Sequence, residues 1–416
     1  MPSNENVQVN SISSPYKILV IGGSYAGLST TLNLLDLCQG RPTRYTATTT
    51  VKAENPFKIS VQITIVDERD GYYHLIGSPL ALATETYSEK AWKKFEDIPA
   101  LQSPSINWIR GTASSVDCEN KVALIMDFNT NQRLEHSYDY FVVASGLRRV
   151  FPTIPQSLLR IEYLDECKRH IKDVRTATGC VVVIGGGAVG IEMSAELKLV
   201  YPEQTVKLVH SREKLLSSEP LPDKTKDRAL LELRAAGVEV ILGQRVISNI
   251  ENGKSRLLTL ADGSQMLAGH VISAISRSVP STTYLPPEAV NEEGYVKITS
   301  TLNFPEEISN AAYHFAVGDL VAWSGIKRCG MAMSMGHSAA INIHQQILHK
   351  HTGVEPKFTH YPEVPPMIGL AVGRSAVVYS PDQGTTYGPD SLRLMFGDDL
   401  GYSICWNYLQ LGKGNA

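Results

Sequence analysis

The sequence has few cysteines, and they are widely scattered. Their spacing allows neither a C-x-x-C pair nor the ligand pattern of a zinc site. The six residues are Cys38, Cys118, Cys167, Cys180, Cys329 and Cys405. We therefore expect no metal site and no electron relay between thiols that are neighbours in sequence. A reducing, cytoplasmic compartment is the easier interpretation.

The sequence also lacks a strong excess of charge and a long apolar run. Lysine and arginine total 39 against 42 aspartates and glutamates, a formal net charge of −3, so nucleic acid is not an expected partner. The longest run of apolar residues and glycine, 180–191, is shorter than the roughly 18 residues of a membrane span. The first 16 residues match neither a signal peptide nor an Arg-rich transit peptide. We expect a soluble protein with no transmembrane segment.

What the sequence does contain is one pattern that occurs twice. An apolar run, a glycine-rich turn and apolar residues at helical spacing follow one another in KILVIGGSYAGLSTTLNLLDL from Lys17, and again in GCVVVIGGGAVGIEMSAELKLV from Gly179. A third apolar run, 314–322, precedes a helix rich in small residues. The predicted fold class is α/β, and the length of 416 residues indicates two or three domains.

Each glycine turn is typical of a site for the pyrophosphate of a dinucleotide. In the pattern G-x-G-x-x-G, glycine is needed where a Cβ would strike the phosphate or the strand, and the helix N-terminus faces the anion. Gly185, Gly187 and Gly190 match the full pattern. In the first copy Gly22 and Gly27 match, but Ser24 occupies the central position, where its hydroxyl can donate to phosphate. One copy is a weak signal, and two copies between strand and helix are much stronger.

The end of the next strand predicts what each site accepts. A carboxylate about 20 residues after the glycines can bond the ribose hydroxyls. In the first copy this is Asp67, provided that 41–58 is a loop insertion, either a solvated loop or a lid over a substrate site. In the second copy His210 takes this place, followed by Ser211 and Arg212, a set that suits the 2′-phosphate of NADPH. The alternative is an exposed basic turn and a site that also takes NADH.

The order of motifs resembles a known family. VIGGSYAG, YDYFVVASG, VVVIGGGAVGIE and HFAVGDLVA are similar to the flavoproteins with two dinucleotide-binding domains. HLIGSPLALA, PPMIGLAVG and FGDDLGYSICWNYL resemble their apoptosis-inducing-factor-like branch, which includes ferroptosis-suppressor-type NAD(P)H:quinone oxidoreductases and fungal homologues. The resemblance implies an NAD(P)H-binding Rossmann domain inserted in an FAD-binding one, with an α+β segment at the end. The implied boundaries are 1–150 and 276–350 for FAD, 151–275 for NAD(P)H, and 351–416 for the last segment.

The resemblance also implies roles for individual residues. The FAD pyrophosphate would lie against Gly22, Gly23, Ser24 and Gly27. The FAD ribose would lie at Asp67 and the adenine at Ala113. Ala144 and Gly146 would mark the crossing between the two domains, and Gly318 and Asp319 would lie at the ribityl chain. Glu192 would lie beside the nicotinamide and flavin edge, and Lys327 near the flavin pyrimidine ring. Asp319 could instead cap a helix, and Glu192 could be a solvated acid. His74, Trp406 and Tyr408 are either core residues or part of a quinone site.

These observations predict an FAD-dependent oxidoreductase that takes a hydride from NAD(P)H. Because no C-x-x-C follows the first glycine turn, a disulfide reductase is disfavoured. A quinone is the expected acceptor on the resemblance alone. Two alternatives stay open: a tailoring oxidase or dehydrogenase of small-molecule biosynthesis, and a binding protein that senses the NAD(P)H redox state. Assembly into a homo-oligomer is left open.

Overall fold

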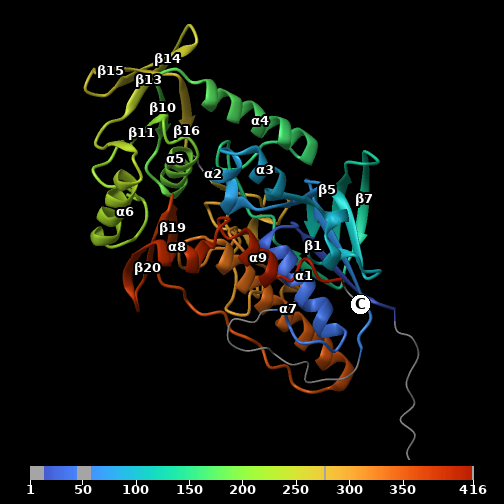
Figure 1. The fold of residues 1–416 in the computed structure, drawn as a ribbon. Helices are drawn as coiled ribbons and strands as arrows, with labels where there is room; N and C mark the ends of the chain where they lie inside the picture. Colours follow the sequence, from blue (N-terminus) through green and yellow to red (C-terminus); the bar gives the residue numbers. More distant parts are fainter. Residues whose placement is uncertain (1–13, 45–57, 276–277, 415–416) are drawn as a thin grey trace, which may run out of the picture.

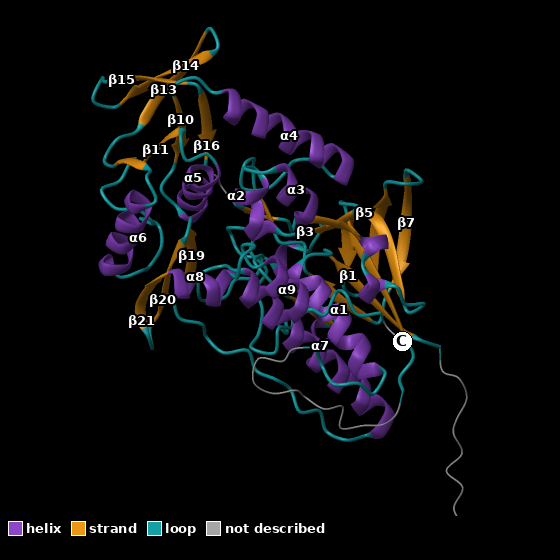
Figure 2. Cartoon of the chain, viewed as in Figure 1, coloured by secondary structure: helices purple, strands orange, loops and turns teal. Residues whose placement is uncertain are grey.

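The computed structural model describes residues 14–44, 58–275 and 278–414. It contains one mixed sheet, whose β18, β8, β1, β2 and β5 are parallel, and one parallel sheet, with helices packed on them (Figures 1 and 2). The segment expected to be a loop or lid, 41–58, falls for the most part outside the described residues. The first sheet has the order β18-β8-β1-β2-β5-β6-β7. Its strands are β1 (Tyr16–Ile21), β2 (Val61–Asp67), β5 (Ile106–Asp117), β6 (Val122–Asp127), β7 (Gln132–Ser137), β8 (Tyr140–Val143) and β18 (His314–Ala316).

The second sheet repeats the parallel arrangement on a smaller scale. Its order is β12-β11-β10-β16, and every neighbouring pair is parallel. The strands are β10 (Cys180–Ile184), β11 (Thr205–Val209), β12 (Glu239–Ile241) and β16 (His270–Ser273). An antiparallel sheet lies at its end, formed by β13 (Val246–Asn252), β14 (Ser255–Leu260) and β15 (Gln265–Ala268). The expected α/β class with two strand–glycine–helix units is thus observed.

The helices follow the sequence pattern closely. They are α1 (Tyr25–Cys38), α2 (Ser78–Ala81), α3 (Glu85–Ala91), α4 (Arg160–Thr176), α5 (Ala188–Val200), α6 (Asp223–Ala235), α7 (Cys329–Thr352), α8 (Pro389–Phe396) and α9 (Tyr402–Tyr408). Figure 1 shows α1 and α7 lying side by side. Gly336 permits this approach, since a Cβ there would meet the Ala26 carbonyl. The Ser29 hydroxyl donates to the Met333 carbonyl at 2.7 Å, which ties the two helices together.

Two short strand pairs lie outside the larger sheets. The first joins β9 (Leu147–Arg148) and β17 (Val279–Pro280), which are antiparallel and lie where the chain leaves and re-enters the first unit. The second joins β3 (Gly71–Tyr73) and β4 (Trp92–Lys94). Single 3-10 turns occur at η1 (Leu75–Gly77), η2 (Phe95–Asp97), η3 (Pro99–Leu101), η4 (Pro287–Ala289) and η5 (Ala311–Tyr313).

The C-terminal segment has the expected α+β composition and bridges the two units. Its strands are β19 (Ile368–Val372), β20 (Ser375–Ser380) and β21 (Gly384–Gly388), all antiparallel. Leu370 and Val377 are buried in the apolar core of the second unit. Cys405 and Leu409, which follow in α9 and just after it, are buried in the core of the first. The segment therefore holds the two units in one arrangement.

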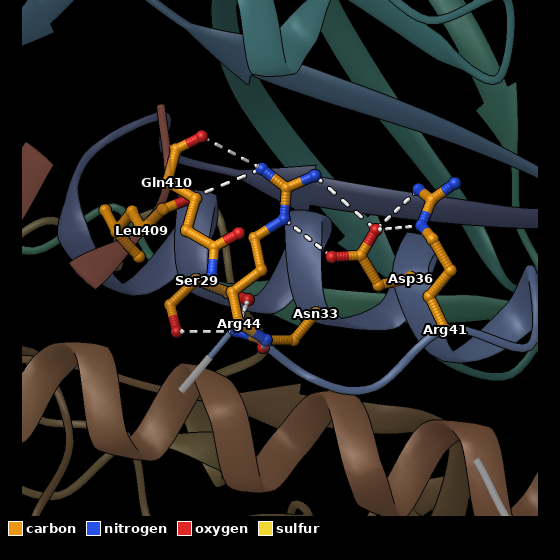
Figure 3. A network of polar contacts seen from close by, with 7 residues as sticks. All are labelled: Ser29, Asn33, Asp36, Arg41, Arg44, Leu409 and Gln410. Carbon is orange, nitrogen blue, oxygen red and sulfur yellow. Dashed lines mark hydrogen bonds and ion pairs between the residues drawn. The ribbon is translucent and has the colours of Figure 1, made fainter. Parts of the chain in front are cut away.

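A buried ion pair fastens the end of this segment to α1 (Figure 3). Arg44 donates from Nε to Asp36 Oδ2 at 2.6 Å and from Nη1 to the carbonyls of Leu409 and Gln410 at 3.4 Å. The side chains of Arg44 and Asp36 are only 6% and 7% exposed. Arg41 reaches the same carboxylate from a position that is 35% exposed. Asp36 thus has one buried and one half-solvated cationic partner.

Replacing each arginine by alanine separates these two contributions. Arg44→Ala leaves a buried carboxylate short of its main partner and removes the bonds to the C-terminal carbonyls, so we expect a loss of about 3 kcal/mol in the free energy of unfolding. Arg41→Ala, the matched control on the same carboxylate, should cost about 1 kcal/mol or less because the pair is screened by water. Urea unfolding of both variants measures the difference. Equal losses would contradict the assignment of Arg44 as the principal anchor.

Candidate functional site

The first glycine turn approaches the end of β8 so closely that a side chain would not fit. Gly22 has φ +112°, and a Cβ there would collide with the Ala144 carbonyl. A Cβ at Gly27 would collide with the Gly22 carbonyl. Ser24, by contrast, has φ −105°, which any residue adopts. The serine that departs from the usual pattern therefore sits where the backbone does not require glycine.

The start of α1 offers free hydrogen-bond donors. Ser24 is the N-cap residue, its hydroxyl does not cap the helix, and the first turn, which is fully described, contains no acidic residue. The first N–H groups of a helix lack partners within the helix, so they bind an anion placed at this end. The cradle of bare backbone at Gly22–Gly27 and these donors fit a pyrophosphate.

Asp67 holds the turn from the side. It is the last residue of β2, as the sequence register requires, and accepts from the Gly23 N–H at 2.6 Å and the Arg69 N–H at 2.9 Å. Burial raises the pKa of its carboxyl group, against the effect of Arg69. The role of Asp67 at a ribose stays a prediction, but its position at the mouth of the glycine turn is suited to it.

The second glycine turn repeats this geometry with a different partner. Gly185 has φ +118°, and a Cβ at Gly190 would collide with the Gly185 carbonyl. The Gly186 N–H donates to His210 Nδ1 at 3.1 Å, in the place where Gly23 donates to Asp67 in the first unit. Gly187 is the N-cap of α5, and a Cβ there would have nothing described within 4 Å. This turn also fits a pyrophosphate.

His210 is held inward rather than free to bind a phosphate. Its Nδ1 accepts from Gly186, so Nε2, which lies 3.1 Å from Ser217 Oγ, carries the proton. Burial, with a smaller effect of Arg212, lowers the pKa of the imidazole, which is therefore neutral. Ser211 and Arg212 are exposed beside it. Of the basic residues expected to face a 2′-phosphate, Arg212 is the one with a charge available.

The segment after β18 contacts α1 and the residues after β9, where the chain leaves the first unit. Gly318 has φ +91°, and a Cβ there would lie 3.0 Å from the Ala26 methyl carbon. Asp319 Oδ2 accepts from Arg149 Nη2 at 2.9 Å, with both side chains mostly buried. Asp319 thus lies beside the link that leaves the first unit. Its predicted role at the ribityl chain stays a prediction.

Three other expected site residues have mainly structural surroundings. Lys327 donates from Nζ to the Val321 carbonyl at 2.6 Å, and burial lowers its pKa. Ala113 lies inside β5 and is 7% exposed, with its methyl group in the core. Gly146 has φ +66°, and its carbonyl accepts from the Ser281 N–H at 3.0 Å. This bond joins the segment where the chain leaves the first unit to the segment where it re-enters.

Two glutamates on α5 lie one helical turn apart, Glu192 half-buried and Glu196 buried. Glu192 accepts from the Ala371 N–H at 3.2 Å, and burial raises its pKa to about 8. Glu196 is 2% exposed, burial raises its pKa to about 7, and none of the described residues hydrogen-bonds its Oε1. Glu192 also interacts electrostatically with Glu196 and with Cys329 at the start of α7. It therefore lies where the second unit faces the first and carries a proton at neutral pH.

A buried polar cluster adjoins this region, and most of it was not anticipated. His74 Nδ1 lies 3.1 Å from the Tyr25 hydroxyl and 3.2 Å from that of Tyr72, while Nε2 lies 2.9 Å from the Leu400 carbonyl. Because a carbonyl only accepts, Nε2 carries the proton. Burial lowers the pKa of His74 to about 4. His74 was considered from the sequence, whereas Tyr25, which follows Ser24 in the first glycine turn, and Tyr72 were not.

Aromatic residues of α9 cover the cluster. Tyr402 contacts the His74 ring edge-on, at a centroid distance of 5.4 Å, and stacks on Trp406 at 5.6 Å. His74 is fully buried, while Tyr402 and Trp406 are partly exposed. The structure thus brings two of the three residues considered for a quinone site, His74 and Trp406, into one aromatic cluster.

Comparison with known proteins decides the family. The model of the pyridine nucleotide-disulphide oxidoreductases matches residues 16–336. The chain belongs to this family. It is 51% identical to Oxidoreductase OXR1 of Ajellomyces capsulatus, over 99% of this chain and 92% of that protein. It is 23% identical to Ferroptosis suppressor protein 1 of Xenopus tropicalis, over 82% and 83% of the two chains.

A solved structure shows the same fold. The sulfide:quinone oxidoreductase of Aquifex aeolicus matches with a TM-score of 0.66 and 17% identity, over 95% of this chain and 92% of that one. As a pyridine nucleotide-disulphide oxidoreductase, the protein is an FAD-dependent NAD(P)H oxidoreductase. The resemblance to ferroptosis-suppressor-type enzymes, the fold class and the cofactors are confirmed. Within the described residues, no helix has both the length and the apolar character needed to cross a membrane.

Glu196→Gln tests the buried carboxyl group of α5. Since its pKa is raised from 4.5 to about 7 by burial, the folded state binds the proton more tightly than the unfolded state. Wild type should therefore lose stability relative to the variant as the pH rises from about 4.5 to about 7, by at most about 1.4 kcal/mol per pH unit, with no further change above pH 7. Urea unfolding at several pH values measures this.

The control is Glu203→Gln, which removes one negative charge from an exposed position just after α5. A stability difference between Glu196→Gln and wild type that stayed constant across this pH range would show that the Glu196 carboxyl group is not buried as described.

Proposed function

We propose that this oxidoreductase passes electrons from NAD(P)H, with a preference for NADPH, through FAD to a quinone. When bound, FAD would supply the chemistry of hydride uptake from the nicotinamide and of two-electron transfer to the acceptor. The residues of the chain would bind and orient the two dinucleotides and handle the protons. The turn at Gly22–Gly27, with Asp67, would hold FAD, and the turn at Gly185–Gly190 would hold NAD(P)H.

The protonated carboxyl group of Glu192 carries this proposal. Reduction of a quinone to a quinol takes up two electrons and two protons, so the site needs a proton donor. Glu192 lies in the second turn of α5, where the second unit faces the first, and its pKa of about 8 leaves it protonated at neutral pH. A group with a pKa near the working pH is an effective general acid. Glu192 would donate its proton to a quinone oxygen.

The alternative route through a disulfide in α1 has little support. That helix contains one cysteine, Cys38, at its last position. Cys38 is fully buried, and burial raises the pKa of its thiol to about 12. A thiol of this kind is inert towards disulfide exchange. The structural neighbour from Aquifex aeolicus is a sulfide:quinone oxidoreductase, and together with the homology to ferroptosis suppressor protein 1 it favours a quinone instead.

Rapid-mixing absorbance of the FAD-loaded protein tests the acceptor and the donor group together. The protein is reduced anaerobically with NADPH and then mixed with a water-soluble quinone, with dioxygen or with a small disulfide. We expect the quinone to re-oxidise the flavin fastest, at a rate that falls as the pH rises through about 8 because Glu192 then loses its proton.

Glu192→Gln should slow the quinone step and remove its dependence on pH in this range, while reduction by NADPH changes less. Faster re-oxidation by dioxygen or by the disulfide would contradict the choice of a quinone. A pH profile that the substitution leaves unchanged would contradict the role of Glu192.

The preference for NADPH depends on Arg212. Its guanidinium is exposed beside a neutral His210, at the strand end where a carboxylate would select NADH. A charge-assisted bond to a 2′-phosphate contributes about 1.5 to 3 kcal/mol, which corresponds to a preference of roughly tenfold to a hundredfold. Arg212→Ala should raise KM for NADPH and leave KM for NADH nearly unchanged. Arg245→Ala, an exposed arginine on the next turn, is the control. Equal efficiency with both donors in the wild type would show that Arg212 does not read the phosphate.

A further inference from the structure

One arginine from the link between the two units contacts the carboxylate that is predicted to meet the ribityl chain. Arg149 follows β9, where the chain leaves the first unit, and its Nη2 donates to Asp319 Oδ2 at 2.9 Å. Its Nε donates to Ser278 Oγ at 3.3 Å, just before β17, where the chain re-enters. The side chains of Arg149 and Asp319 are only 15% and 19% exposed. One mostly buried guanidinium thus joins both links to the segment after β18.

This contact leaves one oxygen of the Asp319 carboxylate for a ligand. Arg149 bonds Oδ2, and none of the hydrogen bonds between described residues reaches Oδ1. A carboxylate oxygen accepts hydrogen bonds from hydroxyl groups such as those of a ribityl chain. Gly318, where a Cβ would lie 3.0 Å from the Ala26 methyl carbon, places the segment against the first turn of α1. Asp319 is therefore held beside the glycine turn that fits a pyrophosphate, with Oδ2 fixed and Oδ1 unused.

The charge of the cofactor explains why this carboxylate needs a cationic partner. A pyrophosphate at the start of α1 is negatively charged, and like charges repel each other strongly in a medium of low polarity. An unpaired Asp319 would therefore oppose the binding of the pyrophosphate. Lys327 also interacts with Asp319, but its ammonium group donates to the Val321 carbonyl. Arg149 is thus the cation that pairs directly with this carboxylate.

We propose that Arg149 is a positioning residue for FAD that acts through Asp319. Its guanidinium fixes the carboxylate so that Oδ1 accepts from a ribityl hydroxyl, and it cancels the charge that would otherwise repel the pyrophosphate. Arg149 itself need not touch the cofactor. This role rests on the proposed function, which places FAD at the turn Gly22–Gly27. It does not depend on the identity of the electron acceptor.

The rate at which the FAD-loaded full chain releases its cofactor tests this role. After dilution, the rise in flavin fluorescence measures the dissociation of FAD. Arg149→Ala should release FAD roughly tenfold to a hundredfold faster than wild type, because a charge-assisted bond to a mostly buried carboxylate is lost. Arg149→Lys, which keeps the charge, should recover part of this loss. Arg148→Ala is the matched control: this neighbouring arginine pairs with Glu68 from a side chain that is 58% exposed, and its loss should leave FAD release as in wild type.

A double variant separates positioning from a general loss of stability. Adding Asp319→Asn to Arg149→Ala removes the unpaired charge but keeps an accepting oxygen, so FAD release should become slower again. Circular dichroism checks that each variant is folded, and Arg149→Gln takes the place of Arg149→Ala if the alanine variant is not.

Two results would overturn the role of Arg149. One is FAD release from Arg149→Ala at the wild-type rate. The other is a double variant that releases FAD as fast as Arg149→Ala, since the guanidinium would then act on the cofactor directly or only on the fold. Release of FAD involves no acceptor, so either result leaves the proposed quinone reduction untouched. A failure of wild type to reduce quinones would equally leave this test intact.

Discussion

One hydrogen bond, made twice, sets the geometry on which both halves of the molecule depend. In each unit the second residue of the glycine turn donates its N–H to the side chain at the end of the next parallel strand, Gly23 to Asp67 and Gly186 to His210. This hydrogen bond fixes the glycine turn against the sheet. The position of the turn then fixes where the following helix starts. Because the helix begins without a capping side chain from its N-cap residue, its first N–H groups remain directed at the same opening.

The two copies differ in charge, and this difference explains why one fold can hold two dinucleotides. Asp67 is a hydrogen-bond acceptor with lone pairs left after its two N–H partners, which suits ribose hydroxyls. His210 uses both ring nitrogens inside the protein and is neutral, so it neither attracts nor repels a phosphate. Selectivity at the second site then passes to its exposed neighbours. A single residue type at the end of a strand thus changes the chemistry of the site while the backbone stays the same.

The fold and the two glycine turns could be predicted from the local sequence pattern of strand, turn and helix. Contacts between segments that are distant in sequence could not. The register from Gly27 to Asp67 could be restored because strand, turn and helix follow one another in sequence. The contact between the Tyr25 hydroxyl and His74 was not foreseen, since nothing in their spacing reports that the two side chains meet. The ion pair between Arg44 and Asp36 could not be predicted for a related reason. Its contribution to stability depends on its burial, and it is buried because the C-terminal residues Leu409 and Gln410 pack beside Arg44. The hydrogen bond from Lys327 to a carbonyl of its own loop could not be foreseen either, and the place of Lys327 near the flavin stays a prediction.

The packing around α5 is where these constraints converge. Its half-buried Glu192 accepts from the Ala371 N–H of the C-terminal segment, and the buried Glu196 lies one helical turn further on. Burial raises the pKa of both carboxyl groups, to about 8 for Glu192 and about 7 for Glu196. Two ionised groups at this spacing would repel each other in a medium of low polarity. The packing of the C-terminal segment against α5 therefore also keeps Glu192 ready to give a proton.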